Sequence, residues 1–333
     1  MSSKRDPLSG RVGHLSDHQQ EALTQFRTEL KNEGYLVPLR HDDACLLRFL
    51  RARKFDIPKA KAMITSQERW RKDFGVDELH KGFDFPEKAE VDKYYPQFYH
   101  KTDKDGRPVY IERLGKIDVK ALYTITTQER LLKRLVYEYE RCLNDRFPAC
   151  TIHSKSEIPI ETSCTILDLH NVGISAFVQV KDYVFKASAI GQDHYPESMG
   201  KFFIINSPWG FSTIWKFIKP WLDEVTVAKI NILGSSYQKE LLAQIPPENL
   251  PVDLGGTCAC EGGCSLSDDG PWNDPEIIKK VEEWKEERRK RVDAEEKDPA
   301  TSIVALAPEP SAPAHGISAD LPQEGDTITP VVS

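Results

Sequence analysis

The chain has 333 residues and a formal net charge of −7, and it is 39% hydrophobic and 29% charged, which is typical of a globular protein. The acidic balance argues against nucleic acid as a partner, and no apolar run reaches the roughly 18 residues that a membrane-spanning helix needs. The start MSSKRDPLSG lacks the apolar core of a signal peptide, so the seven cysteines are predicted to be mostly free thiols in a reducing compartment.

Helices are predicted for the N-terminal part of the chain, after an unstructured segment over residues 1–14. In LSDHQQEALTQFRTELKNEG, the spacing of Ser16 and Gln19 is typical of a capping box at the start of a helix. A second helix is predicted in DDACLLRFLRARKFD, and a third opens at Pro58. We therefore expect a helical domain over residues 15–90.

The pattern changes after that domain. A hairpin turn at Asp105-Gly106 joins two strand-like segments, QFYHKT and PVYIERLG. Strand patterns then alternate with helical patterns, in the order TSCTILDL, KFFIINS and KINILGS, which predicts an α/β fold with a mostly parallel sheet. We expect this domain to cover 91–275, followed by a charged helix over 276–297 and a disordered tail over 298–333.

One segment, SPWGFSTIWKFIKPWLDE, is unusually rich in large apolar side chains. If it is helical, one face carries Phe211, Ile214, Trp215, Ile218 and Leu222. Phe217 and Trp221 point elsewhere, and Pro220 should break the helix. The composition fits a core helix packed on the sheet. It also fits a movable lid, with its inner face on a bound lipid and its outer aromatics at a membrane interface.

Six segments follow one another in a characteristic order over about residues 15–275. They are LLRFLRARKFD, HKTDKDGRPVYIERLG, ETSCTILDL, YPESMGKFFIINSPWGF, VTVAKINILGSSYQKELLAQIPPENLPVDLGG and GPWNDP. Together they resemble fungal phosphatidylinositol/phosphatidylcholine transfer proteins of the CRAL-TRIO fold. The resemblance implies a helical bundle followed by a lipid-binding α/β domain, in which a sheet floors an apolar cavity closed by a helical gate. The tryptophan-rich segment lies at the gate position.

A two-tailed lipid sets a physical condition on such a carrier. Two acyl chains have on the order of 30 methylenes, and at roughly 0.8 kcal/mol each their exposure to water costs more than about 20 kcal/mol. The carrier therefore needs a closed cavity, and it must exchange its lipid while the cavity is open against a bilayer.

An inositol lipid requires Arg or Lys on its phosphate and hydrogen-bonding groups for its hydroxyls. By resemblance, Arg53, Lys54 and Lys229 belong near the phosphate. Thr226 would contact a hydroxyl, and Glu197 would orient Lys229 or the inositol ring. Without the resemblance, the pattern of RFLRARKF favours a solvated basic helix face, and Glu197 and Lys229 would pass as ordinary surface charges.

A choline lipid presents a quaternary ammonium, which binds aromatic faces, and a phosphate that accepts hydrogen bonds from hydroxyls. By resemblance, Tyr99 and Tyr110 serve the choline, and Ser163 and Thr165 serve its phosphate. Ser163 and Thr165 are two residues apart in a strand pattern, so they share a face. The alternatives are core packing for the tyrosines and backbone hydrogen bonds for the two hydroxyls.

We therefore expect a carrier of phosphatidylinositol and phosphatidylcholine, with phospholipid as its ligand, no cofactor and no enzymatic activity. The sequence has no Gly-x-Ser-x-Gly elbow and no Gly-rich phosphate loop. Two other classes remain open. One is a carrier of another lipophile, such as a sterol or tocopherol. The other is a lipid hydrolase built around Ser207, His194 and Asp193.

The cysteine loop TCACEGGC carries Cys258, Cys260 and Cys264 in a spacing only loosely like that of a metal site. Without a nearby histidine we expect no metal there. With no lipidation motif and no strongly basic block, membrane attachment should be transient. We expect a cytoplasmic monomer. The resemblance implies visits to Golgi and endosomal membranes and a role in phosphoinositide signalling and Golgi vesicle traffic.

Overall fold

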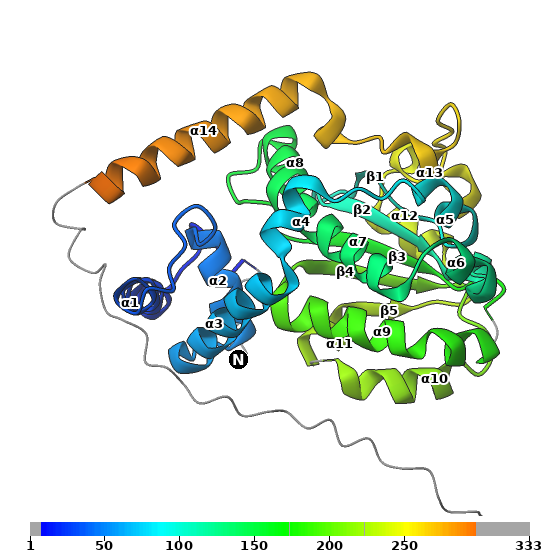
Figure 1. Cartoon of the computed structure of the whole chain (residues 1–333). Coiled ribbons are helices and arrows are strands. Elements are labelled where there is room, and N and C mark those ends of the chain that lie inside the picture. Colours follow the sequence, from blue (N-terminus) through cyan, green and yellow to red (C-terminus); the bar gives the residue numbers. More distant parts are fainter. Residues whose placement is uncertain (1–7, 173, 223, 298–333) are drawn as a thin grey trace, which may run out of the picture.

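The computed structural model describes residues 8–172, 174–222 and 224–297 (Figure 1). The expected disordered tail, 298–333, lies outside the described residues, as does the segment 1–7. Among the described residues no helix is both long and apolar enough to cross a membrane.

The N-terminal part is helical, as predicted. Its helices are α1 (Asp17–Asn32), α2 (Asp43–Ala52), α3 (Ile57–Phe74), α4 (Val76–Gly82) and α5 (Lys88–Tyr94). The Ser16 side chain accepts from the Gln19 backbone and the Gln19 side chain accepts in return, which confirms the capping box. The apolar faces of α1, α2 and α3 meet in one core, which includes Phe26, Leu46 and Ile64.

Residues 8–14 are ordered, which corrects the expectation that the chain is unstructured through residue 14. They form a turn closed by a backbone bridge between Arg11 and His14. Arg51 donates to the Gly10 carbonyl at 2.8 Å, and Arg11 and Arg51 both pair with Glu161, at 2.9 and 2.6 Å. The segment thus links α2 to the α/β domain. Its short polar sequence has no periodicity that would have indicated this role.

The α/β domain is built on a five-stranded sheet. Its strands are β1 (Gln97–Thr102), β2 (Pro108–Arg113), β3 (Ser163–Asp168), β4 (Met199–Ile205) and β5 (Ile230–Ile232), and they lie side by side in chain order. β1 and β2 form the predicted antiparallel hairpin, and every other neighbouring pair is parallel. The prediction of a mostly parallel sheet is therefore confirmed.

Helices connect and cover the strands (Figure 1). They are α6 (Val119–Ile125), α7 (Gln128–Arg141), α8 (Phe147–Ser154), α9 (Ile174–His194), α10 (Phe211–Ile218), α11 (Glu224–Lys229), α12 (Gln238–Gln244), α13 (Cys264–Ser267) and α14 (Pro275–Lys297). A π-helical turn, Cys142–Arg146, joins α7 to α8. Ile277 and Val281 anchor the charged helix α14 in the cluster that contains Cys150, and Arg288 of α14 pairs with Asp42 at 2.9 Å.

The strand register gives the sheet two different faces. One face packs on α12 through a core that includes Val109, Ile111, Cys164, Ile166, Phe203 and Leu241. On the other face, one residue of each strand lies in a row across the sheet: Tyr99, Tyr110, Thr165, Phe202 and Ile230. A second row on the same face, next to the first, holds Gln97, Glu112, Leu167 and Ile204. These two rows line a cavity instead of a second core.

Candidate functional site

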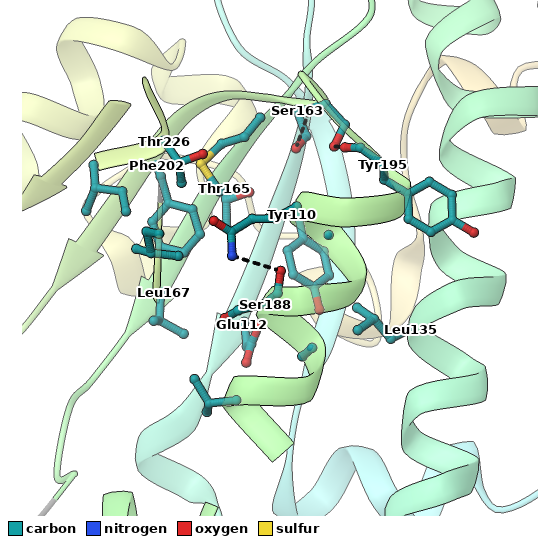
Figure 2. A pocket seen from close by; sticks show the side chains of 18 of the residues that line it. Tyr110, Glu112, Leu135, Ser163, Thr165, Leu167, Ser188, Tyr195, Phe202 and Thr226 are labelled. Atoms are coloured by element: carbon teal, nitrogen blue, oxygen red, sulfur yellow. Dashed lines mark hydrogen bonds between the residues drawn. The ribbon is translucent and has the colours of Figure 1, made fainter. Parts of the chain in front are cut away.

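The cavity has a volume of about 1080 Å³ and lies over the second face of the sheet. Figure 2 shows side chains of the sheet, including Tyr110, Thr165 and Phe202, facing Leu135 of α7 and Ser188 of α9. If a methylene fills roughly the 30 Å³ share of a water molecule in the liquid, on the order of 30 methylenes need about 900 Å³. The cavity therefore has room for two acyl chains.

Helix α10 covers this cavity with one face. Phe211 and Ile214 are buried, and Trp215 and Ile218 also line the cavity. The outer face is open, since the Phe217 side chain is 65% exposed and the preceding Trp209 is fully exposed. A core helix would be buried on nearly every side, so that interpretation of the segment is wrong.

The end of α10 follows the sequence prediction. The α-helix stops at Ile218, and Lys219–Trp221, which contains Pro220, continues as a single 3-10 turn. Trp221 and Leu222 line the cavity, and the Trp221 ring meets Phe185 of α9 edge-on at 5.5 Å between centroids. The covering element is thus a short helix followed by a break, packed by its aromatics on α9.

Five residues form what we call the basic set: Arg53, Lys54, Glu197, Thr226 and Lys229. All of them line the cavity. Lys229 at the end of α11 donates to Glu197 at 3.1 Å, which is one of the two arrangements expected for Glu197. The Lys54 side chain is exposed and makes no ion pair with any described residue. The set therefore offers positive charge at a partly exposed edge of the cavity.

The backbone of the basic set is unusual. Lys54 has φ 52° and Glu197 has φ 55°, and Phe55, which follows Lys54, has φ 62°. Left-handed conformations are uncommon for residues other than glycine, because they cost conformational energy and persist only where the surrounding structure holds them. Residues of this kind cluster at functional sites. Both turns aim charged side chains at the same cavity.

Four residues form the aromatic set: Tyr99, Tyr110, Ser163 and Thr165. All line the cavity, and three of them are neighbours in one row of the sheet. The two tyrosine rings lie 5.0 Å apart. Burial raises the pKa of both tyrosines well above the usual value, so their hydroxyls stay protonated. The Tyr99 hydroxyl is already hydrogen-bonded to Cys142. Ser163 donates to the Ser198 carbonyl at 3.5 Å, a long contact that a stronger acceptor can replace (Figure 2).

Arg146 is a member of this region that the sequence analysis missed. Its guanidinium lies 3.9 Å from the centre of the Tyr99 ring and pairs with Glu138 at 2.8 Å, and both charged residues line the cavity. One face of Tyr99 is therefore already occupied by a cation, and its ring also contacts Tyr110 and Trp272, so the half-buried Tyr110 is the more accessible ring for a choline. Nothing in the helical pattern around Arg146 distinguishes it from a surface arginine.

Glu112 was missed as well, although a signal existed. It stands two residues after Tyr110 on β2, so strand alternation puts both on the cavity face (Figure 2). Burial raises the pKa of the Glu112 carboxyl, and the Tyr95 hydroxyl donates to it. The floor of the cavity thus contains one carboxyl among tyrosines.

The hydrolase alternative is not supported by the geometry. The His194 ring stacks on Trp70 of α3 at 3.8 Å between centroids, and burial lowers its pKa to about 4. Ser207 donates its backbone N–H to Leu233, and no hydrogen bond between described residues joins Ser207 to His194. His194 therefore acts as a packing residue between the two domains.

The cysteine loop lies apart from the cavity. Cys258, Cys260 and Cys264 gather near His100 of β1, with all four potential ligand atoms within 4.8 Å of one another. The premise that these thiols have no histidine nearby is wrong, because the sheet brings one to them. None of the four residues lines the cavity.

The sheet, the cavity and the covering helix define a protein class. The CRAL/TRIO domain matches residues 92–256, and the CRAL/TRIO N-terminal domain matches residues 16–66. The chain belongs to the CRAL/TRIO family, which confirms the family expected from the six segments.

Within this family, the chain is similar to several individual proteins. The chain is 56% identical over 280 residues to Sec14 cytosolic factor of Schizosaccharomyces pombe, covering 84% of this chain and 96% of the relative. It is 46% identical over 260 residues to phosphatidylinositol/phosphatidylcholine transfer protein SFH4 of Arabidopsis thaliana, covering 77% and 42%. The crystal structure of Sfh5 matches with a TM-score of 0.55 at 15% identity, over 69% of this chain and 84% of that one. This last likeness concerns the fold alone.

Proposed function

We propose that the protein binds one molecule of phosphatidylinositol or phosphatidylcholine in its cavity and exchanges it between membranes, without covalent chemistry. The observation that carries this proposal is an apolar cavity of about 1080 Å³ lined by two chemically different polar sets. The names of relatives, which include a phosphatidylinositol/phosphatidylcholine transfer protein, support the same ligands.

The basic set is assigned to the inositol lipid. Arg53, Lys54 and Lys229 supply positive charge for the phosphate, and Thr226 contacts a ring hydroxyl. Glu197 holds Lys229 through their 3.1 Å ion pair. A phosphate that replaces Glu197 on Lys229 exchanges one charge-assisted hydrogen bond for another, so the Lys229 ammonium stays paired. Glu197 is then free to accept from an inositol hydroxyl.

The aromatic set is assigned to the choline lipid. Ser163 and Thr165 donate to its phosphate, and the ammonium rests on Tyr110, with Tyr99 packed beside it at 5.0 Å between ring centres. Arg146 and Glu138 lie nearby as an ion pair, so the phosphate and the ammonium each find an opposite charge. This arrangement uses buried and half-buried residues and needs no side chain from the basic set.

Helix α10 and the following 3-10 turn are assigned to the gate. The inner residues Phe211, Ile214 and Trp215 contact acyl chains, and the exposed Phe217 and Trp209 enter the membrane interface when the gate opens. Both environments are apolar, so a lipid crosses between them without meeting water.

We place this activity in the cytoplasm, with transient visits to Golgi and endosomal membranes, where lipid exchange supports phosphoinositide signalling and vesicle traffic. The protein would act as a monomer. The names of several relatives as cytosolic factors support the first part of this proposal.

Mass spectrometry of lipid co-purified with the full chain, followed by transfer assays between vesicles, tests the proposal. We expect intact phosphatidylinositol and phosphatidylcholine, and transfer of both. A sterol or tocopherol without phospholipid would show a carrier of the same fold for another lipophile, and new lipid masses after incubation would show an enzyme. Either result rejects the proposed function.

A further inference from the structure

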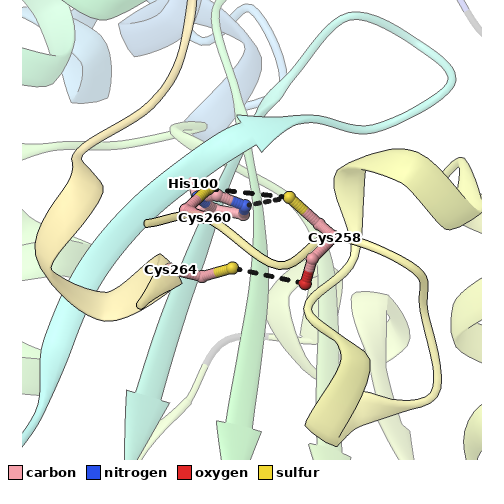
Figure 3. Close-up of side chains that lie close together, drawn as sticks. All are labelled: His100, Cys258, Cys260 and Cys264. Atoms are coloured by element: carbon pink, nitrogen blue, oxygen red, sulfur yellow. Dashed lines mark hydrogen bonds between the residues drawn. The ribbon is translucent and has the colours of Figure 1, made fainter. Parts of the chain in front are cut away.

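The cysteine loop and β1 form a side-chain cluster that the proposed function does not use. His100 lies on β1 and is completely buried, and Cys258, which is 7% exposed, faces it from the loop (Figure 3). Cys260 and Cys264 complete the group. Three thiols and an imidazole are soft or intermediate ligands, a combination that suits zinc better than magnesium or calcium.

We propose that these four residues form a structural zinc site. A tetrahedral zinc with Zn–S bonds of about 2.3 Å and a Zn–N bond of about 2.0 Å separates its ligand atoms by about 3.5–3.8 Å. Cys258 Sγ lies 3.7 Å from Cys260 Sγ and 3.3 Å from His100 Nε2. All four atoms lie within 4.8 Å of one another, so closure around the ion needs a shift of about 1 Å.

Ser267 sets the orientation of the histidine. Its Oγ lies 3.3 Å from His100 Nδ1 and donates to the Cys264 carbonyl at 3.1 Å. With its one proton on the Cys264 carbonyl, Oγ accepts from His100 Nδ1–H, and this arrangement leaves Nε2 unprotonated toward Cys258. This is the tautomer that ligates through Nε2, and a hydrogen bond on the other ring nitrogen is the usual support of a histidine ligand.

The backbone of β1 is shaped to deliver His100. The register of β1 against β2 shifts between Tyr99 and Thr102, and Lys101 has a left-handed φ of 50°. Lys101 N–H donates to the Asp269 carbonyl at 2.6 Å. The strand therefore leaves its partner next to His100 and bonds to the segment that follows the cysteines. Irregularities of this kind re-aim a side chain.

The backbone of the cysteine loop likewise holds the three cysteines close together. Gly262 and Gly263 have φ values of 73° and 96°, which favour glycine, and Gly263 N–H donates to the Cys260 carbonyl at 2.9 Å. This tight turn returns the chain so that Cys264 comes back toward Cys260. Cys258 is fixed from the other side, since its N–H donates to the Leu250 carbonyl at 3.0 Å.

The site has four protein ligands and no open position, so its role is structural. It would join β1 to α13, and Ser265 and Leu266 of α13 line the lipid cavity. Further along, Trp272 is buried and meets the Tyr99 ring edge-on at 6.1 Å between centroids. Zinc would therefore brace the wall beside the aromatic set. This inference reverses the expectation of no metal, which rested on the loose cysteine spacing and on the apparent lack of a nearby histidine.

The direct test is the metal content of the full chain, purified under reducing conditions and without a metal-affinity resin. We expect one zinc per chain, and after exchange with cobalt the intense visible absorption of tetrahedral thiolate coordination. A folded, reduced chain that holds no zinc after incubation with zinc and dialysis overturns the proposal. A disulfide among the three cysteines in that preparation also overturns it.

Variants locate the site. Cys260→Ser with Cys264→Ser should abolish zinc binding, whereas Cys45→Ala, which removes a thiol as buried as Cys258, should leave it at one per chain. Ser267→Ala should weaken zinc affinity about 10–100-fold and leave the stoichiometry at saturating zinc unchanged. Full zinc retention in the double serine variant refutes the assignment. If that variant does not fold, the cobalt spectrum of the unmodified chain decides. Zinc content is measured without lipid transfer, so either proposal can fail alone.

Discussion

The two polar sets of the cavity are built in opposite ways. The basic set comes from the ends of elements: Lys54 follows α2, Glu197 precedes β4, and Lys229 ends α11. The aromatic set comes from the strands themselves, where Tyr99, Tyr110 and Thr165 stand in one row across β1, β2 and β3. Long cations at a partly exposed edge can adapt to a large hydroxylated ring. A rigid buried row suits a compact headgroup. One cavity can thus serve two headgroups with separate residues.

The largest effect should come from removing two cations of the basic set. Lys54→Ala with Lys229→Ala deletes two hydrogen bonds to a charged phosphate, each contributing about 1.5–3 kcal/mol. We expect phosphatidylinositol transfer between vesicles to fall about 100-fold or more, while phosphatidylcholine transfer stays within about twofold. Lys59→Ala with Lys81→Ala, two exposed lysines that do not line the cavity, is the control. Equal loss of both activities would remove the distinction between the two sets.

The gate should act on both lipids alike. Trp209→Ser with Phe217→Ser removes two exposed aromatics, whose burial in a membrane contributes about 1.5–3 kcal/mol each. We expect transfer of both lipids to slow about tenfold or more, with unchanged lipid content in the purified protein. Leu39→Ser, at a half-exposed leucine of the N-terminal domain, should change neither. A variant that transfers at the normal rate would show that this face does not meet the membrane.

A single hydroxyl in the row should have a smaller and selective effect. Thr165→Val keeps the shape of the side chain and deletes one hydrogen bond worth about 1 kcal/mol. We expect phosphatidylcholine transfer to fall about fivefold with phosphatidylinositol transfer unchanged. Cys164→Ala alters the opposite face of the same strand, in the core on α12, and serves as the control. A drop in phosphatidylinositol transfer alone would reverse the assignment.

The smallest effect concerns stability and pH. Burial raises the pKa of Glu112, so its stabilising contribution is complete below the unfolded pKa and is lost as pH rises through the folded value. Glu112→Gln should therefore stabilise the chain at neutral pH, by about 1 kcal/mol or less, and this gain should vanish below about pH 4. Thermal unfolding across this pH range measures the difference, with exposed Glu78→Gln as control. A gain that persists at acidic pH would contradict a raised pKa.

Most of the fold could be predicted because its signals are local. The capping box at Ser16, the hairpin turn at Asp105-Gly106 and the break at Pro220 each act within a few residues, and all three are found. The headgroup residues were predicted from the family resemblance, and every one of them lines the cavity. Their roles remain proposals for the transfer assays.

The missed features depend on contacts between distant segments. His100 and Cys258 are 158 positions apart, so no spacing rule connects them before the sheet and loop are folded. Arg146 acquires its place over Tyr99 only because the π-helical turn packs on β1. Glu112 was within reach of strand alternation, but a glutamate on a strand is usually a solvent-facing residue. Tertiary placement, which sequence periodicity does not encode, decided the positions of His100 and Arg146.

The cavity walls extend along the chain from Arg51 to Asp268. Nearly every element must therefore be synthesised before the hollow exists, and until then its apolar surfaces are open to aggregation. A lipid captured at closure supplies the missing interior from outside and stabilises the folded chain by mass action. The protein without a lipid should therefore be the least stable form in the exchange cycle. Direct replacement of one lipid by another at the membrane would avoid this lipid-free form.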